Sequence, residues 1–504
     1  MYSNLYTFFA NRFPTNTAKA VIETSDGQSY TYAELDQYSA RLAGRFRRLG
    51  LEPGDRVAVS VENSPHALFV YLGCLRAGLV YLPLNTAYQR RELEYFIADA
   101  EPRAIICRPQ AAATVRELAP AALVETLDER GEGSLTEACQ RLPAEFTPVD
   151  RAPDDTATIL YTSGTTGRPK GVMLSSRNLA ANALALTQAW GMNEADVLLH
   201  TLPLFHAHGL FIATHCMLLG AATMRMVPRF EVAAVLELLP RSTVFMGVPT
   251  LYRRLLGAPE LSRALCRNMR LFTCGSAPLT VETFNQFEHR TGHFILERYG
   301  MTETLITTSN PLDGPRVAGS VGLALPGVSL RVAGEDGRPV PTGVPAEVQV
   351  KGESVFRGYW KQPEKTEQDF TDDGFFKTGD IGRLDAHGYL FLVGRAKDLI
   401  ISGGYNVYPK EIELVINSIE GVVESAVFGV PHPDFGEAVV AAVVPDDAGR
   451  CPKAFEIIER LRTQVANYKV PKRVLFVDAL PRNVMGKVQK DFLSQHYSQL
   501  FSER

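Results

Sequence analysis

The sequence lacks the features that mark several classes of protein. Its seven cysteines are scattered over positions 74, 107, 139, 216, 266, 274 and 451 with no C-x-x-C pair, which argues against a disulfide framework or a zinc site. The longest apolar stretches, such as ALALTQAW, are far shorter than a membrane span. The N-terminal segment MYSNLYTFFANRFP has no basic region before an apolar core, so we expect no secretory signal. Together these absences predict reduced thiols and a cytoplasmic protein.

The sequence also lacks an excess of charge of either sign. The chain has 52 basic and 56 acidic residues, a net charge of −4, and no long run of like charges. This balance argues against nucleic acid or an anionic membrane as the main partner. We find neither an internal repeat nor a low-complexity tract, and the sequence gives no expectation for the oligomeric state. A length of 504 residues with 45% hydrophobic and 21% charged residues predicts a globular protein of more than one domain.

The sequence shows two patterns of apolar and polar residues along the chain. Residues 30–150 alternate short apolar runs with helix-like stretches, and this rhythm continues through MRLFTCGSAPL and HFILERYGMTE, as in helix-covered, mostly parallel sheets. From about Ser329 the pattern alternates around Gly and Pro turns, as antiparallel strands do. After Gly394, PKEIELVINSIEG predicts a helix that opens a compact α+β unit. The fold class is therefore α/β, with a large domain over 1–394 that includes a β-rich portion, and a small mobile α+β domain over 395–504.

The segment YTSGTTGRPKG, residues 161–171, concentrates glycines, hydroxyl side chains and one lysine. A Walker phosphate loop needs four residues between its glycines and then Lys-Ser or Lys-Thr, whereas here only two residues separate Gly164 from Gly167, and Gly171 follows Lys170. The short apolar run VML comes next, so we expect a turn between two strands. Glycines still let backbone amides approach an anion, and Lys170 adds charge. The alternative is a polar surface hairpin.

Further motifs follow in a fixed order: LFTCGSAPL, ERYGMTET, FKTGDIGRLDAHGYLFLVGRAKDLIISGGYNVYPKEIE and PRNVMGK. Together they resemble the adenylate-forming superfamily of acyl-CoA synthetases, luciferases and adenylation domains, over nearly the whole chain. GLVYLPLNTAYQRRELEYFIADAEP, LPLFHAHGLF, GVPTLYRRLL and ERYGMTETLITTSNPLDGPR look most like malonyl-CoA synthetases. The resemblance implies a reaction in two halves. A carboxylate attacks the α-phosphate of ATP with Mg²⁺, and the thiol of coenzyme A then displaces AMP.

The resemblance also implies roles for individual residues. It assigns the β- and γ-phosphates to Thr162, Ser163, Gly164, Thr165, Thr166 and Lys170. It makes Glu303 a catalytic residue and the magnesium ligand, with Thr162 as a second metal ligand. It assigns adenine to Tyr299, Gly300 and Thr302 on one side and to Gly275, Ser276 and Ala277 on the other. Asp380 matches the ribose-binding acid and Arg395 a second ribose and phosphate contact. The alternative for this last pair is a local ion pair.

The C-terminal motif PRNVMGK matches the one that carries the catalytic lysine, Lys487, which would act at the α-phosphate and the carboxylate. Lys490 is the confounding neighbour. Lys397 matches the hinge position, where the small domain would rotate between the two half-reactions. Gly403 and Gly404 would line the pantetheine tunnel of coenzyme A, with a plain flexible turn as the alternative.

The acid is predicted from GVPTLYRRLL. Neighbours on a helix point about 100° apart, so at most one of Arg253 and Arg254 faces inward, and we favour Arg254. An inward guanidinium can grip a second carboxylate with paired hydrogen bonds, which selects dicarboxylates such as malonate. Ser276 and a catalytic His206 are expected helpers, and His208 could equally be a packing residue. Methylmalonate fits the same reasoning.

Two other functions remain open at this stage. One is a related synthetase that uses another short carboxylate or loads a carrier protein's phosphopantetheine. The other is a non-catalytic nucleotide-binding sensor. Lys170, Glu303, Asp380, Arg395 and Lys487 argue against the sensor, since a dead site needs no such set of charges. Pyrophosphate release that depends on an added acid separates the sensor from the enzymes.

Overall fold

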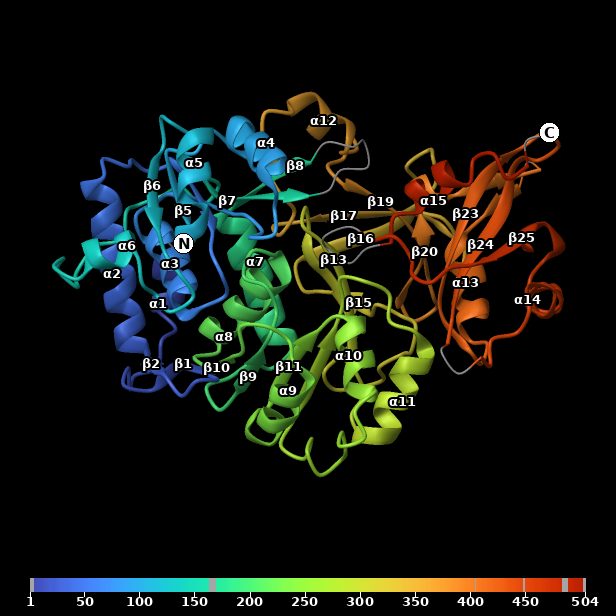
Figure 1. Ribbon diagram of the computed structural model, residues 1–504, viewed down its shortest axis with the longest axis horizontal. Helices are drawn as coiled ribbons and strands as arrows, with labels where there is room; N and C mark the ends of the chain where they lie inside the picture. The colour runs from blue at the N-terminus through green and yellow to red at the C-terminus, as the bar shows by residue number, and fades with distance from the viewer. Residues whose placement is uncertain (1–3, 163–168, 404, 447–448, 483–487, 502–504) are drawn as a thin grey trace. The chain divides into compact units, whose positions relative to one another are not determined.

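The computed structural model describes residues 4–162, 169–403, 405–446, 449–482 and 488–501 (Figure 1). The chain forms two compact units. Unit 1 comprises residues 1–329 and 350–376, and unit 2 comprises residues 330–349 and 377–504. The predicted boundary at residue 394 concerns a hinge, which a division by compactness does not test, so it stays a prediction. The mixed α/β architecture, with a large N-terminal part and a small C-terminal part, is confirmed.

One sheet of unit 1 has the strand order β18–β8–β7–β4–β3–β5–β6. Strands β7, β4, β3, β5 and β6 are parallel, and β8 and β18 are antiparallel to their neighbours. Its strands are β3 (Arg56–Ser60), β4 (Val80–Pro83), β5 (Ala104–Cys107), β6 (Leu123–Thr126), β7 (Thr156–Thr162), β8 (Lys170–Ser175) and β18 (Gly358–Tyr359). The helices of this part of the chain are α1 (Leu5–Ala10), α2 (Tyr32–Arg48), α3 (Pro65–Arg76), α4 (Arg90–Ala100), α5 (Ala112–Leu118) and α6 (Ser134–Cys139). The predicted parallel β–α–β rhythm is confirmed here.

The second sheet of unit 1 has the order β15–β14–β13–β12–β11–β9–β10–β1–β2, parallel from β13 to β1. Its strands are β1 (Ala20–Thr24), β2 (Ser29–Thr31), β9 (Val197–His200), β10 (Thr223–Met226), β11 (Val244–Gly247), β12 (Leu271–Cys274), β13 (Leu296–Met301), β14 (Leu305–Ser309) and β15 (Leu323–Ala324). The later helices of unit 1 are α7 (Ser176–Ala189), α8 (His215–Leu219), α9 (Val232–Leu238), α10 (Pro249–Leu256), α11 (Val281–Thr291) and α12 (Pro363–Gln368), with a π-helical turn over His208–Thr214. Parallel strands end at a common edge, which gathers the segments that follow β9, β12 and β13.

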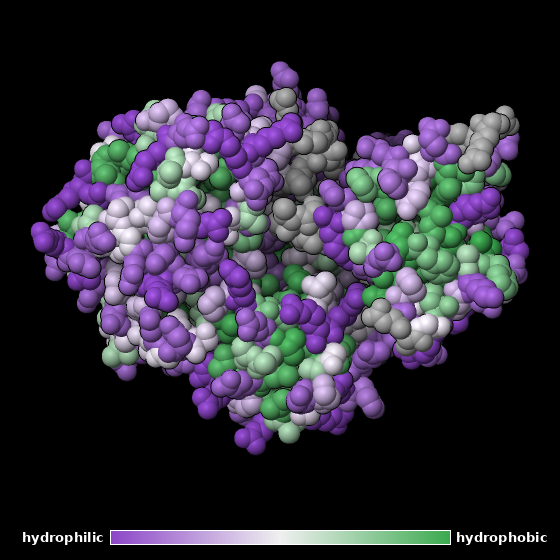
Figure 2. Space-filling view, in the orientation of Figure 1, coloured by the Kyte–Doolittle hydropathy of each residue, from purple (hydrophilic) through white to green (hydrophobic). Residues whose placement is uncertain are grey.

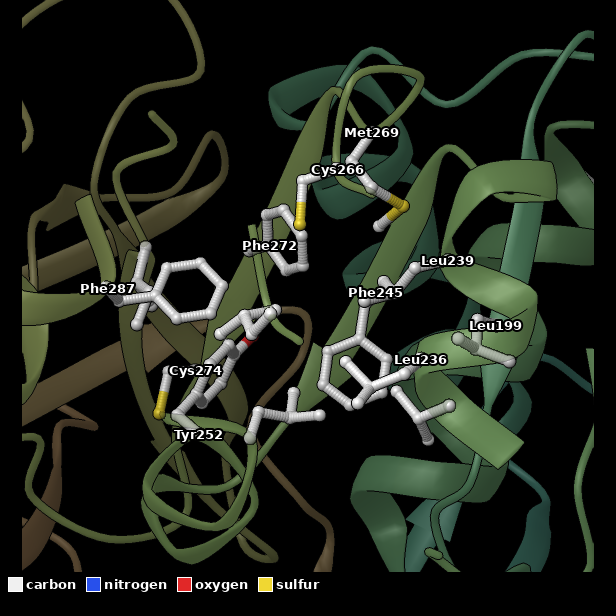
Figure 3. Packing of buried hydrophobic residues seen from close by; sticks show 14 of the residues in the cluster. Leu199, Leu236, Leu239, Phe245, Tyr252, Cys266, Met269, Phe272, Cys274 and Phe287 are labelled. Atoms are coloured by element: carbon white, nitrogen blue, oxygen red, sulfur yellow. The ribbon is translucent and has the colours of Figure 1, made fainter. Parts of the chain in front are cut away.

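The core beside this sheet is formed by apolar and aromatic side chains of β11, β12, α10 and α11 (Figure 3). Phe245, Phe272 and Phe287 are fully buried around Tyr252, whose hydroxyl donates to the Thr273 carbonyl at 2.7 Å. Aromatic rings of this size contribute most of the buried apolar area. The core therefore fixes α10 against β12, next to the motif that follows β12.

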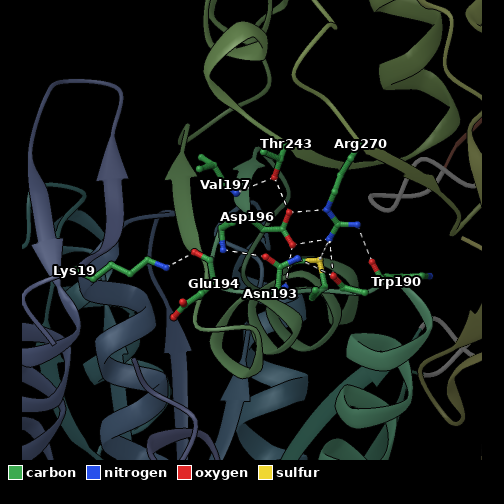
Figure 4. Close-up of polar contacts among 11 residues, drawn as sticks. Lys19, Trp190, Asn193, Glu194, Asp196, Val197, Thr243 and Arg270 are labelled. Atoms are coloured by element: carbon green, nitrogen blue, oxygen red, sulfur yellow. Dashed lines mark hydrogen bonds and ion pairs between the residues drawn. The ribbon is translucent and has the colours of Figure 1, made fainter. Parts of the chain in front are cut away.

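A polar cluster fixes the opposite ends of the same strands (Figure 4). Asp196, just before β9, accepts from the Arg270 guanidinium at 2.5 and 2.7 Å and from the Thr243 hydroxyl at 2.8 Å. Lys19 reaches the Glu194 and Ala221 carbonyls. These contacts satisfy a buried carboxylate and join the starts of β9, β11 and β12.

Unit 2 contains most of a sheet in the order β16–β17–β19–β20 and a second sheet, β22–β21–β24–β23, in which β25 also pairs with β24. The strands are β16 (Val328–Ala333), β17 (Ala346–Gly352), β19 (Phe376–Leu384), β20 (Leu390–Arg395), β21 (Ile400–Ser402), β22 (Tyr405–Val407), β23 (Val422–His432), β24 (Gly436–Pro445) and β25 (Arg473–Phe476). The helices are α13 (Pro409–Asn417), α14 (Ala454–Arg462) and α15 (Lys490–His496). The predicted start of a helix at Pro409 is confirmed.

Alternate residues of β23 and β24 face two separate cores. Val427 and Val439 pack with α13 and α14, whereas Phe428 and Val440 pack with Leu493 of α15. This is the two-residue period of a strand that is covered on both faces.

Hydrophilic residues cover most of the face of unit 1 that Figure 2 shows. Within the described ranges, no helix combines the length and the apolar character needed to cross a bilayer.

Candidate functional site

The glycine-rich segment is the connection of a hairpin. Strands β7 and β8 are antiparallel, with Thr162 opposite Lys170, so the predicted turn between two strands is confirmed. The predicted phosphate ligands Ser163, Gly164, Thr165 and Thr166 lie outside the described residues. Thr162 and Lys170 are half-buried at the two feet of the turn. The hairpin therefore places one hydroxyl and one ammonium group beside the segment that we expect to hold phosphates.

Lys170 lies over an aromatic ring near a buried acid. Its Nζ is 4.3 Å from the centre of the Tyr359 ring, and the Tyr359 hydroxyl is 3.2 Å from Oε1 of the buried Glu303. Burial lowers the pKa of Lys170, while the carboxylates of Asp369 and Glu303 act in the opposite direction. Tyr359 could not be selected from the sequence, because it lies far from Lys170 and Glu303 along the chain. The cluster brings together a cation and an anionic oxygen ligand, as phosphate and metal binding require.

The fit of Mg²⁺ to this cluster can be judged from its donors. Glu303 offers carboxylate oxygen and Thr162 hydroxyl oxygen, both suited to a hard cation. Among the residues that the structure describes, no three His, Cys, Asp or Glu side chains converge on one point. A magnesium ion that keeps waters and takes phosphate oxygens as its remaining ligands fits this set, as is usual for Mg²⁺ with nucleotides.

The predicted adenine walls lie on neighbouring strands. Tyr299, Gly300 and Thr302 lie on or directly after β13, and Gly275, Ser276 and Ala277 follow β12, the parallel neighbour of β13. A Cβ atom on Gly300 would be 1.8 Å from the Leu305 carbonyl oxygen, so only glycine fits there. Ser276 has a φ of +69°, a strained value for a residue with a side chain. The ends of β12 and β13 thus hold both motifs in one place.

Arg298, which we did not predict, is the main new feature of this site. It lies on β13, is 3% exposed, and its Nε and Nη2 atoms have no hydrogen-bond partner. A Cβ atom on Gly275 would be 2.6 Å from its Cζ, so the absence of a side chain at Gly275 makes room for the guanidinium. Burial lowers the pKa of Arg298 to about 10, which leaves it charged at neutral pH. A buried cation with unmade hydrogen bonds is a site for an anion.

A buried histidine lies near this guanidinium. His208 is fully buried, its Nε2 has no partner, and its Nδ1 lies 3.4 Å from the Ser276 hydroxyl. Burial and then the charge of Arg298 lower the pKa of His208, so its imidazole is neutral. The half-buried His206 accepts from the His208 backbone N–H through Nδ1 at 3.3 Å. His206 and His208 therefore lie together, and His208 is in contact with Ser276, while the expected helper role of Ser276 and His206 stays a prediction.

The prediction that Arg254 faces inward is wrong. Tyr252 and Leu255 form the buried face of α10, and residues 253 and 254 are each about 130° from the centre of that face at 100° per residue. Both arginines are accordingly exposed, and the Arg254 guanidinium stacks on the Phe230 ring at 4.7 Å. A buried guanidinium with nitrogens that have no hydrogen-bond partner does lie in unit 1, but it is that of Arg298.

Unit 2 carries the predicted ribose ligands. Strands β19 and β20 place Asp380 opposite Arg395, and Arg395 Nε is 3.0 Å from Asp380 Oδ1. Asp380 is buried and Arg395 is half-buried. The pairing agrees both with a shared ribose and phosphate contact and with the local ion pair considered as its alternative, so their role stays a prediction.

The remaining predicted residues of unit 2 are partly described. Lys397, the expected hinge residue, forms ion pairs with Asp491 at 3.0 Å and Asp398 at 3.7 Å. Gly403 is exposed, has a φ of +57° and donates its N–H to the Phe435 carbonyl at 2.9 Å. The predicted tunnel residue Gly404 and the predicted catalytic Lys487 lie outside the described residues.

Comparisons with known proteins agree with this arrangement. The model of a family described as AMP-binding enzyme matches residues 8–360, and that of an AMP-binding enzyme C-terminal domain matches residues 411–487. The crystal structure of ATP-bound MatB from Rhodopseudomonas palustris is 50% identical, covers 100% of both chains and has a TM-score of 0.97. A feruloyl-CoA synthase from Amycolatopsis is 38% identical over 92% of this chain and 93% of its own length. A malonate–CoA ligase from Arabidopsis thaliana is 33% identical over 95% and 87%.

Proposed function

Because this chain belongs to the AMP-binding enzyme family and is an AMP-forming acid–thiol ligase, we propose that it joins malonate to coenzyme A through a malonyl-adenylate and releases AMP and pyrophosphate. ATP and coenzyme A are the co-substrates expected of such a ligase, and MatB binds ATP. The choice of malonate rests on one observation, the buried and unpaired guanidinium of Arg298.

The physical argument for a diacid starts from the cost of that guanidinium. A buried polar group without a partner costs about 1–3 kcal/mol, and more when it is charged. The distal carboxylate of malonate can accept hydrogen bonds from Nε and Nη2 in parallel, the strongest arrangement for this pair of groups. His208 and Ser276 would lie beside the same carboxylate. A monocarboxylate leaves the cation unpaired, which disfavours its binding by about 2–5 kcal/mol.

The first half-reaction activates the proximal carboxylate. A carboxylate is a poor acylating agent because oxide would have to leave, and attack on the α-phosphate replaces oxide by AMP. The side chains of this chain hold the charges that move: Lys170 beside the phosphates, and Lys487 at the oxygens where negative charge develops. Bound Mg²⁺ would neutralise phosphate charge, with Glu303 and Thr162 as its protein ligands. Asp380 and Arg395 would hold the ribose.

In the second half-reaction the thiol of coenzyme A attacks the acyl carbon and AMP leaves. Gly403 and Gly404 would line the path of the pantetheine arm, and Lys397 would be the hinge that permits a second arrangement of the small domain. Lys487 has no part in this half. The two half-reactions can therefore be separated by experiment.

Methylmalonate is a second candidate acid, because the Arg298 guanidinium is suited to any short diacid. The feruloyl-CoA synthase is more similar in identity than the malonate–CoA ligase, so overall identity does not select the acid. Methylmalonate keeps both carboxylates and fits the Arg298 argument equally well. A carrier protein's phosphopantetheine could also replace free coenzyme A.

The test is a panel of acids with ATP, in which hydroxylamine traps the adenylate. We expect kcat/KM for malonate or methylmalonate to exceed that for propionate and a long fatty acid by at least about 30-fold, which corresponds to the lower limit of about 2 kcal/mol for an unpaired buried charge. Succinate measures the tolerance for one more methylene group. Equal turnover of propionate and malonate would refute the proposed specificity, while acid-dependent pyrophosphate release would still identify a ligase.

A further inference from the structure

The described residues on either side of 483–487 form a bridge, which is the base of the segment that carries Lys487. Residues 483–487 lie outside the described residues, but Arg482 and Val488 on either side form an antiparallel bridge. The Gln489 N–H donates to the Pro481 carbonyl at 2.8 Å. The described residues on the two sides of 483–487 are therefore tied together, and Val488 lies two residues before Lys490.

Ion pairs hold both sides of this base. Lys490, the first residue of α15, has its Nζ 2.6 Å from Glu413 Oε1, and the side chains are only 18% and 9% exposed. The same Oε1 accepts the Val427 N–H at 2.9 Å, which ties it to the interior of β23. On the other side of the bridge, Arg482 forms an ion pair with Glu424 of β23. The residues that flank 483–487 are thus anchored to α13 and β23 by side chains, in addition to the backbone bridge.

The Lys490–Glu413 pair differs from the ion pairs around it. Lys397 and Asp491 are 36% and 62% exposed, so solvent and salt screen their attraction. The nearly buried Glu413 is screened far less, and its carboxylate fixes Lys490 in one position. The half-buried Asp398 also lies near Lys490: burial raises the pKa of Asp398, and the charge of Lys490 lowers it by a smaller amount. If Glu413 lost its charge, Asp398 would become the competing partner, and α15 would shift at its first turn.

We propose that Glu413 is a positioning residue for adenylation: by holding Lys490 at the start of α15, it fixes the base from which Lys487 acts. The proposal rests on the proposed function, in which Lys487 serves only the first half-reaction. A misplacement of about 1 Å at a catalytic group can cost on the order of 10²-fold in rate. Glu413 itself contacts neither substrate nor phosphate in this account.

The test uses Glu413→Gln, which keeps the shape of the side chain and removes its charge. We expect malonyl-adenylate formation, measured as pyrophosphate release in a single turnover, to fall on the order of 10²-fold. Malonyl-CoA formation from supplied malonyl-adenylate should stay within about 3-fold, since a displaced Lys487 is not needed there. Lys490→Met should reproduce the split, Lys490→Arg should largely restore adenylation, and the double variant Glu413→Gln/Lys490→Met should lose no more than either single one.

The matched control is Glu411→Gln. Glu411 lies on the same helix and pairs with Lys469 at 2.7 and 2.8 Å, but it holds the turn Asn467–Lys469 and not α15. We expect both half-reactions of this variant within about 3-fold of the parent enzyme. Equal loss in both halves for Glu413→Gln, or an adenylation rate that does not change, overturns the positioning role.

Lys487→Ala separates this failure from failure of the proposed function. If Lys487→Ala loses adenylation alone while Glu413→Gln does not, only the positioning role is wrong. If Lys487→Ala spares adenylation, the proposed role of Lys487 fails and the positioning role fails with it. Should Glu413→Gln fold poorly, Lys490→Met with its Lys490→Arg partner carries the same test.

Discussion

The two units differ in whether their buried polar side chains have hydrogen-bond or ion-pair partners. In the described part of the chain, every buried side-chain nitrogen or oxygen without a hydrogen-bond partner belongs to unit 1, including atoms of Arg298, His200 and His208. In unit 2 the buried carboxylates of Glu413 and Asp380 each face a cation within 3.0 Å. Unpaired buried groups destabilise a fold, so a cluster of them at one edge of a sheet indicates bonds that a ligand completes. The contrast predicts an anion-binding site in unit 1, and in unit 2 it shows buried carboxylates that are held by ion pairs.

The largest effect is expected from Arg298→Met, which replaces the guanidinium with an apolar side chain. The distal carboxylate of malonate then loses its charged partner in a buried site, so kcat/KM for malonate should fall on the order of 10³-fold, about 4 kcal/mol. Steady-state pyrophosphate release with malonate and with propionate measures the effect. The ratio of the two acids should move toward propionate, since the variant no longer carries an unpaired charge in their presence.

Arg254→Met is the matched control for Arg298→Met. Its guanidinium is exposed on Phe230, so we expect kcat/KM for malonate within about 3-fold of the parent enzyme, as for most exposed side chains. A large selective loss of malonate activity in Arg254→Met, with little change in Arg298→Met, would restore the original assignment and remove the contrast between the units.

These two arginines show what the sequence could and could not predict. The alternation of apolar runs and helix-like stretches was enough to predict the parallel sheets. The local sequence also predicted the turn before Lys170 and the helix that begins at Pro409. Adjacent arginines on a short helix could not be oriented, because the buried face is set by Tyr252 and Leu255 and by the core that receives them. The burial of Arg298 depends on the space above a glycine of the neighbouring strand. No local pattern contains that information.

Contacts between distant segments were equally out of reach. The Lys490–Glu413 pair joins residues on α15 and α13, and Tyr359 reaches Lys170 and Glu303 from far along the chain. Lys490 was visible in the sequence only as a neighbour that could be confused with Lys487. The motifs PKEIE and GKVQK each carry more than one charge, so the sequence does not mark Glu413 or Lys490 as buried, and the pairing of the two requires the tertiary structure.

Acid should destabilise unit 1 before unit 2. Burial lowers the pKa of His200 from 6.5 to about 4, and it also lowers the pKa of His208. A histidine that is neutral when folded contributes stability above pH 6.5, and this is lost as pH falls toward 4, because the unfolded chain takes up the proton first. For His200 the loss is on the order of 3 kcal/mol. Both tryptophans, Trp190 and Trp360, belong to unit 1, so urea unfolding followed by their fluorescence reports it.

The variant His200→Asn tests the cause of this acid sensitivity. It removes the titrating group, so the fall in unfolding free energy between pH 6.5 and 4 should be smaller by a similar amount. The parent protein at pH 7 supplies the reference, since the variant also changes packing. An unfolding free energy that is independent of pH across this window in the parent protein contradicts the prediction.

Gly275→Ala should disturb the carboxylate site by a smaller amount. The added methyl group would lie 2.6 Å from Arg298 Cζ, so the guanidinium must move by several tenths of an ångström. We expect KM for malonate to rise on the order of 10-fold, with KM for ATP less affected. Gly44→Ala is the control, because its methyl group would meet only Leu142 at 3.9 Å. If the loss of malonate activity in Gly275→Ala/Arg298→Met equals the sum of the losses in Gly275→Ala and in Arg298→Met, the glycine does not act through Arg298.

The smallest effect is expected at the exposed ion pair of unit 2. Asp491→Asn removes the partner of Lys397 at a site where both side chains are open to solvent. The substitution removes both the ion pair with Lys397 and a negative charge from the first turn of α15, and it should lower the local unfolding free energy by less than about 1 kcal/mol. Hydrogen exchange of the α15 amides measures it, and 1 M salt should reduce the difference further because a Debye length of about 3 Å screens the pair. The contrast with Glu413→Gln is the decisive point: both substitutions remove a carboxylate that pairs with a lysine, and the two pairs involve the adjacent positions Lys490 and Asp491 of α15. If Asp491→Asn alters adenylation as strongly as Glu413→Gln, exposure does not distinguish the two pairs, and burial is not what makes unit 2 a holder of charge.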